Sequence, residues 1–170
     1  LDVSGPGYAF KGRIDFFENN PVFGTGMRGA IHASFQPKIE VGAVIQFGMV
    51  NGYRYWFADA SVSFAPGVPL GPSGLTLYGF GVGAYYHMRR EGFTKVSLPE
   101  PSPSVSKDSL SFDDIPSQLG QSMTGIKYVP DDDILIGIKA MIALGTASRE
   151  VFNAELQFEI SFTSAGGLNQ

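Results

Sequence analysis

Residues 39–64 read IEVGAVIQFGMVNGYRYWFADASVSF, two long alternating runs that are joined by Asn51-Gly52. Asn-Gly predicts a two-residue type I′ turn, because both central positions of that turn need a positive φ. The turn fixes the register of the hairpin: Val50 faces Tyr53, and every pair outward from it follows. The stretch therefore predicts a long antiparallel β-hairpin whose two faces can be written residue by residue.

The two faces of this hairpin differ in composition. One face is almost wholly apolar and holds the pairs Met49/Arg54, Phe47/Trp56, Ile45/Ala58, Ala43/Ala60, Val41/Val62 and Ile39/Phe64. The other face tolerates water and holds Gly48/Tyr55, Gln46/Phe57, Val44/Asp59, Gly42/Ser61 and Glu40/Ser63. We expect the apolar face to pack in the core and the mixed face to lie at the surface.

Residues 134–162 predict a second hairpin with the same plan. A five-residue loop at 146–150 gives the apolar pairs Leu144/Phe152, Ile142/Ala154, Ala140/Leu156, Ile138/Phe158, Ile136/Ile160 and Ile134/Phe162. On the opposite face Lys139 lies across from Gln157 and diagonal to both Glu155 and Glu159, with which it can pair. We expect the two hairpins to bury their apolar faces against a common core.

The rest of the chain continues the same pattern. Alternation predicts strands at 8–16 and 27–36, and a further strand at 75–88 in which Gly79, Gly81 and Gly83 leave one face bare. No amphipathic helix that could connect parallel strands is apparent. The expected fold class is therefore all-β, an antiparallel meander of about seven or eight long strands that forms a sandwich or a closed or nearly closed barrel.

Residues 91–125 predict one long loop, because this stretch is rich in Ser, Pro and acidic residues. A loop of this length inside a compact domain is usually functional or disordered. The alternative is that it covers a sheet edge, with Leu110, Phe112, Ile115 and Leu119 as apolar anchors.

Composition limits the class of protein. The chain has 170 residues, a net charge of −4 and no cysteine, which predicts a single β domain over residues 1–170 without disulfides. Its basic residues are scattered, so we expect no nucleic-acid partner. The chain begins at Leu1 and its residues 164–170 resemble a linker, so we expect a piece of a larger extracytoplasmic or cell-surface protein.

Motifs for catalysis and metal binding are weak. His32 and His87 lie on different predicted strands without neighbouring ligands, and no nucleophile, phosphate-loop or zinc motif occurs. Glu155 and Glu159 share one face of a strand, a spacing that carboxylate pairs also reach by accident. The run at 131–133, three aspartates, either binds a cation or forms a solvated turn. We expect no enzyme, no cofactor and no metal site.

Aromatic side chains are the candidate ligand-binding residues. Tyr53, Tyr55 and Phe57 lie on the mixed face of the first hairpin, and Tyr85 follows the bare glycines. An exposed aromatic row can stack on sugar rings or bury itself against a protein. The structural alternative is that Tyr55 covers Gly48, its cross-strand neighbour, and that Tyr85 does the same for another glycine.

Three functions follow from these patterns. The first is a non-enzymatic structural or binding module with a carbohydrate or protein ligand. The second is a small outer-membrane-type β-barrel with its apolar face against lipid; strand length favours it, whereas the loops count against it, since Asn51-Gly52 lies at the same end as the long loop. The third is a shell or filament subunit that assembles through a strand edge.

Overall fold

The computed structural model describes residues 1–91, 117–147, 153–166 and 168–169. The strands are β1 (Asp2–Gly5), β2 (Tyr8–Asn20), β3 (Gly24–Phe35), β4 (Ile39–Val50), β5 (Tyr53–Pro69), β6 (Thr76–Tyr86), β7 (Met88–Arg90), β8 (Tyr128–Pro130), β9 (Ile134–Gly145), β10 (Asn153–Thr163) and β11 (Leu168–Asn169). A 3-10 turn, η1 (Gly71–Ser73), precedes β6. Within the described ranges, no helix has the length and apolar character needed to cross a membrane.

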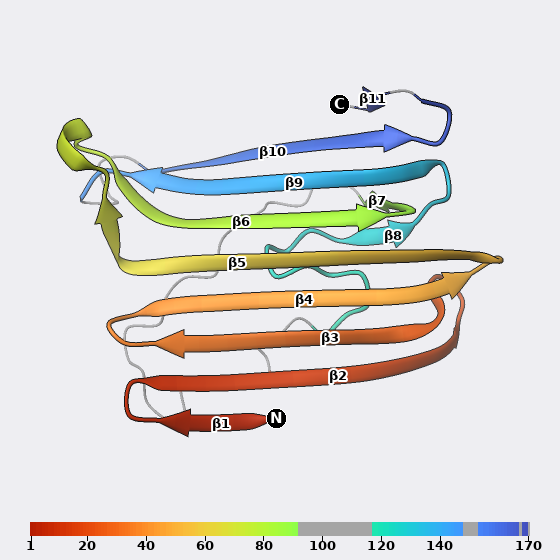
Figure 1. Cartoon of the computed structure of the whole chain (residues 1–170), viewed down its shortest axis with the longest axis horizontal. Helices are drawn as coiled ribbons and strands as arrows, with labels where there is room; N and C mark the ends of the chain where they lie inside the picture. Colours follow the sequence, from red (N-terminus) through yellow and green to blue (C-terminus); the bar gives the residue numbers. More distant parts are fainter. Residues whose placement is uncertain (92–116, 148–152, 167, 170) are drawn as a thin grey trace.

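Nine of these strands form one sheet in the order β1-β2-β3-β4-β5-β6-β9-β10-β11, with every neighbouring pair antiparallel (Figure 1). Seven of the nine strands are at least eleven residues long, which confirms the predicted meander of long strands. β1 and β11 lie at opposite edges, and no pairing joins them in the part of the chain that the structure describes. Within the described residues the sheet is therefore open.

The first hairpin has the predicted register. Val50 faces Tyr53, and the pairs continue without interruption to Ile39 and Phe64. Asn51 and Gly52 both have positive φ, 50° and 85°, as a type I′ turn requires.

The predicted register of the second hairpin was wrong by two residues. Leu144 faces Ala154, and Phe162 faces Ile136. The last pair before the connection is Gly145 with Asn153, so seven residues separate the strands where five were expected; 148–152, including Phe152, lie outside the described residues. Because the shift is an even number, every side chain keeps its predicted face, and Lys139 lies across from Glu159.

A small second layer covers one face of the sheet. β7 and β8 pair as a short ribbon, and residues 117–127 run before β8 with a bridge between Gln121 and Lys127. We call residues 88–90 and 117–130 the cover (Figure 1). Its side chains Met88, Met123, Ile126, Tyr128 and Val129 form one buried cluster with the sheet, and Leu119 packs against that cluster. The predicted loop therefore lies partly over a face, although Leu110, Phe112 and Ile115 fall outside the described residues.

The expected assignment of buried and exposed faces was wrong. The cover lies on the mixed face of the first hairpin, which we call the covered face, and Gln46, Asp59 and Ser61 there are buried. On the opposite side, the apolar face, Ile45, Phe47 and Val82 are exposed. The physical reason is that the cover packs on the aromatic and glycine positions of the mixed face, while nothing in the described chain packs on the apolar face.

Candidate functional site

The four predicted ligand-binding residues do not form an exposed row. Tyr55, Phe57 and Tyr85 are 1%, 1% and 3% exposed, because all three belong to the buried cluster that the sheet forms with the cover and Phe23. Only Tyr53 is partly exposed; its ring lies edge-on against His87, with ring centres 5.8 Å apart. The expectation of an exposed aromatic surface is thus corrected, and a ligand-binding role for these residues stays a prediction.

Their contacts fit the structural alternative. The Tyr55 hydroxyl donates to the carbonyl of Phe23 over 2.7 Å, and a Cβ at Gly48 would overlap the Tyr55 ring. The Tyr85 hydroxyl donates to Glu159 over 2.8 Å, and a Cβ at Gly137 would overlap the Tyr85 ring. Each glycine therefore leaves space for a cross-strand aromatic ring.

Tyr128 of the cover packs against two of these rings in a tilted arrangement. Its ring centre lies 4.8 Å from that of Tyr85 and 5.6 Å from that of Phe57. Among the described residues its hydroxyl has no hydrogen-bond partner. Burial of this hydroxyl raises the pKa of Tyr128 above its ordinary value.

Replacing Tyr128 with Phe is expected to reduce the loss of stability at alkaline pH. A raised pKa in the folded state means that the unfolded chain releases the Tyr128 proton first, above about pH 10. Stability is then lost as pH rises, at about 1.4 kcal/mol per pH unit for this group, and Tyr128→Phe removes that contribution. Urea unfolding at about pH 8 and about pH 11 measures the difference. Equal pH dependence of the two proteins would contradict burial of the hydroxyl.

Charged and polar groups of the sheet attach the cover. Asp59 and Lys139, 3% and 5% exposed, form an ion pair, and Lys139 also donates to Thr124 of the cover over 2.6 Å. The second carboxylate oxygen of Asp59 accepts the backbone N–H of Met123 over 3.0 Å. One buried ion pair thus connects two strands to the second layer. Gly83 lies between these strands, and a Cβ there would be 2.7 Å from Lys139 and 2.9 Å from Asp59.

A second buried polar group lies farther along the covered face. His32 Nε2 is 2.9 Å from Glu40 Oε2, and the Ser34 hydroxyl donates to the other oxygen of Glu40 over 2.8 Å. The serine contacts the carboxylate and not the imidazole, so the three residues lack the order of a nucleophile–base–acid relay. Within the described ranges, no three His, Cys, Asp or Glu side chains are placed to hold a metal ion together.

The aspartates at 131–133 lie in the turn before β9. Asp131 accepts the backbone N–H of Asp133 over 3.1 Å and pairs with Arg89 at 3.0 Å. These contacts are those of a solvated turn.

The apolar face has an ordered arrangement of residue types, which appears when cross-strand neighbours are followed over the whole sheet. Beyond the row of Thr25, Met49 and Arg54 at the Asn51-Gly52 turn, the next row, called the near aromatic row, contains Phe16, Met27, Phe47, Trp56, Tyr86, Ile136 and Phe162. The far aromatic row contains Tyr8, Phe35, Ile39 and Phe64. Aromatic residues thus occupy five of seven positions in one row and three of four in the other.

Three central rows lie between them and contain only apolar residues or glycine. They are Ile14, Gly29, Ile45, Ala58, Ala84, Ile138 and Ile160; Gly12, Ile31, Ala43, Ala60, Val82, Ala140 and Phe158; and Phe10, Ala33, Val41, Val62, Phe80, Ile142 and Leu156. Every Tyr and Trp in these five rows belongs to an aromatic row. The face is therefore an apolar band, rich in aliphatic residues and with three phenylalanines, between two borders where the Tyr and Trp residues lie.

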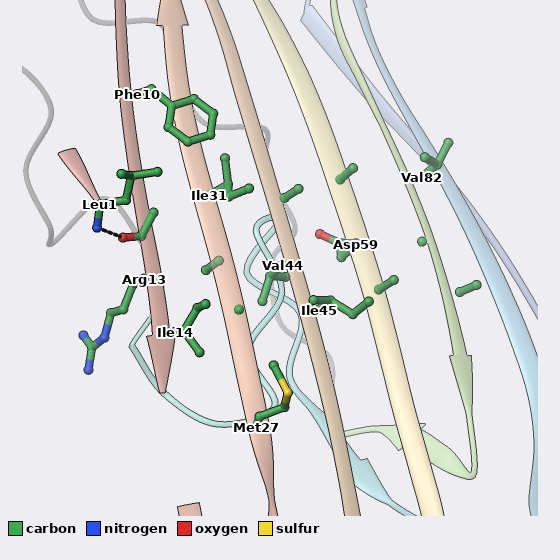
Figure 2. Close-up of a pocket in the computed structure, with 18 residues that line it drawn as sticks. Leu1, Phe10, Arg13, Ile14, Met27, Ile31, Val44, Ile45, Asp59 and Val82 are labelled. Atoms are coloured by element: carbon green, nitrogen blue, oxygen red, sulfur yellow. Dashed lines mark hydrogen bonds between the residues drawn. The ribbon is translucent and has the colours of Figure 1, made fainter. Parts of the chain in front are cut away.

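A shallow groove of about 1010 Å³ runs over the middle of this band. Its lining includes the small residues Ala43, Ala58, Ala60 and Ala84. Larger side chains that line it come from separate strands; Figure 2 labels Ile14, Ile31, Ile45 and Val82 among them.

The sequence encodes these rows, but no single hairpin contains enough of them to show the pattern. The aromatic borders appear only when both hairpins, β2, β3 and β6 are aligned through their shared registers. Comparison of the chain with protein-family models, with curated proteins and with solved structures found no match.

Proposed function

We propose that this sheet is a wall of a membrane-embedded β-structure, with its apolar face against lipid hydrocarbon and its covered face toward an aqueous interior. The observation that supports this most is the burial of charge together with the exposure of apolar surface. Phe16, Phe158 and Val82 are 78%, 58% and 53% exposed, whereas Asp59 and Lys139 are almost fully buried. Soluble monomers rarely expose a continuous apolar surface of this extent, and in transmembrane sheets the apolar residues point outward.

The spacing of the aromatic rows agrees with a bilayer. From Phe47 to Ile39 the chain advances eight residues, about 27 Å along the strand at ~3.4 Å each. A strand tilt of about 40° reduces this to about 20 Å across the membrane, close to the ~25 Å apolar band of transmembrane sheets. Trp56, Tyr86 and Tyr8 then lie at the two interfaces, where Trp and Tyr are enriched.

The covered face has the composition of an aqueous lining. Its charged residues in the long strands are Lys11, Arg13, Asp15, Arg28, His32, Glu40, Asp59, Lys139, Glu155 and Glu159. The interior of a transmembrane sheet is polar and is often filled by a segment of the same chain. In this proposal the cover is the segment that fills the interior, because it lies on the covered face and forms hydrogen bonds with Asp59 and Lys139 there.

The connection from β6 to β9 is the loop whose length and position count against a membrane β-structure. The long connection from β6 to β9 was expected to extend at the same end as Asn51-Gly52. Residues 117–130 instead run back over the covered face, so the length of this connection does not measure a loop outside a membrane.

The other expected functions stay predictions. A binding module and a self-assembling subunit would each need protein, not lipid, to cover the apolar face. The expected extracytoplasmic or cell-surface location fits the proposal, since transmembrane sheets of this type belong to outer membranes.

Trp56 provides a direct test, because it is the chain's one tryptophan and lies in the near aromatic row. In vesicles containing brominated lipids, we expect Trp56 fluorescence to be quenched more strongly by bromine near the headgroup than by bromine deep in the acyl chain. A Val82→Trp substitution in a Trp56→Phe background moves the probe to the central rows, and the order of quenching is expected to reverse.

The control places the probe on the other face. Phe57→Trp in the same Trp56→Phe background is expected to escape quenching at both depths, with circular dichroism verifying the fold. The proposal fails if bromolipids do not quench Trp56, or if the covered-face probe is quenched as strongly.

A further inference from the structure

Most of the β10 edge of the sheet has no neighbouring strand among the described residues. β11 pairs with β10 only at Ser161 and Phe162, so the outer edge of residues 153–160 pairs with no strand in the described ranges. Leu156 and Phe158 on this stretch are each 58% exposed. At the opposite edge, β1 pairs with residues 8–11 of β2 and the Leu1 amine donates to the carbonyl of Gly12 over 2.9 Å, and the outer side of residues 13–20 likewise pairs with no strand in the described ranges.

The unpaired edge has a distinct charge pattern. On the covered-face side it presents Glu155, Gln157 and Glu159 in succession. Glu159 accepts the Tyr85 hydroxyl and lies 3.5 Å from Arg90, whereas Glu155 is exposed and makes no ion pair within the described ranges. On the apolar side the same stretch presents Leu156, Phe158 and Ile160.

This pattern disfavours a second copy of β10 as the neighbour. Two copies pairing antiparallel about Gln157 would place Glu155 of one across from Glu159 of the other. An antiparallel pairing centred on Leu156 would place Glu155 of one copy across from Gln157 of the other and diagonal to its Glu159. Like charges on facing strands are destabilising.

We propose that the β10 edge takes up a β-strand that alternates apolar and basic residues, antiparallel to β10 and in line with β11. β11 sets the direction and the register at Ser161 and Phe162. The apolar residues of the added strand continue the apolar face, and its basic residues lie across from Glu155 and Glu159. The inference rests on the proposed function in one respect: an open strand edge is not tolerated in hydrocarbon, so this edge needs a partner there.

The probe is an eight-residue labelled peptide of alternating Val and Lys, added to the whole chain in a non-ionic detergent. We expect it to slow amide hydrogen exchange at residues 153–160 and to bind about tenfold more tightly than a matched peptide with Glu in place of Lys. The substitution Glu155→Lys is expected to reduce or reverse this preference, whereas Asp132→Lys, at an exposed turn, leaves it unchanged.

Three results would overturn the inference: equal affinity for the two peptides, protection outside β10 and β11, or protection of β10 by self-association without peptide. The outcome is independent of the bromolipid test. Peptide binding without quenching of Trp56 would reject the membrane wall alone, and quenching without charge-dependent binding would reject this edge site alone.

Discussion

Replacing Val82 with Arg is expected to lower the free energy of unfolding from a bilayer by about 2–4 kcal/mol. Val82 lies in a central row of the apolar face and is half exposed, so its substituent would project into the hydrocarbon if that face contacts lipid. The free energy is measured by urea titration of the protein folded into vesicles.

Tyr86→Arg is the matched control, because Tyr86 lies on the same strand and the same face, four residues farther, in the near aromatic row. An arginine at the interface is expected to cost only about 0–1 kcal/mol. If this face lay in water, each substitution would change the free energy of unfolding by no more than about 0.5 kcal/mol, so the two effects would be nearly equal. Equal effects would therefore reject a lipid-facing band.

Local signals predicted the strands and their pairing where the turn chemistry was explicit. Asn51-Gly52 defines one turn geometry, and all the pairs from Val50 to Ile39 followed from it. The connection after Gly145 has no comparable signal, and the register of the second hairpin was wrong there. Alternation still placed Lys139 on the correct face, since period 2 is unaffected by a shift of two residues.

Alternation could not show which face is covered. Alternation assigns Phe47 and Gln46 to opposite faces of the sheet, but the burial of each face depends on what packs above it. Here that layer consists of residues 117–127 together with β7 and β8, and these two strands have three residues each, too few for a periodic signal. Because this second layer could not be predicted, Tyr55 and Tyr85 were expected to be exposed. Their glycine partners Gly48 and Gly137 were the better signal, because a missing side chain leaves space for a ring.

Breaking the ion pair between Asp59 and Lys139 is expected to lower the free energy of unfolding by as much as Val82→Arg does, or by more. Lys139→Met leaves the buried Asp59 carboxylate with the N–H of Met123 and no cation, and the expected cost is about 3–5 kcal/mol. Asp59→Asn leaves Lys139 uncompensated and is expected to cost about as much. Urea unfolding of each variant measures the loss.

The double variant distinguishes a buried pair from a general loss of packing. Removing both charges leaves no uncompensated ion, so Asp59→Asn with Lys139→Met is expected to recover most of the stability lost in either single variant. The matched pair is Lys127 with Glu91, at 2.6 Å but about half exposed, where removal of one partner is expected to cost no more than about 1 kcal/mol. If the effects of the two single substitutions simply add, the charges do not act as a pair. In that case the cover is attached to the sheet by its apolar cluster and by Gln46, which accepts the N–H of Gly120 over 2.9 Å.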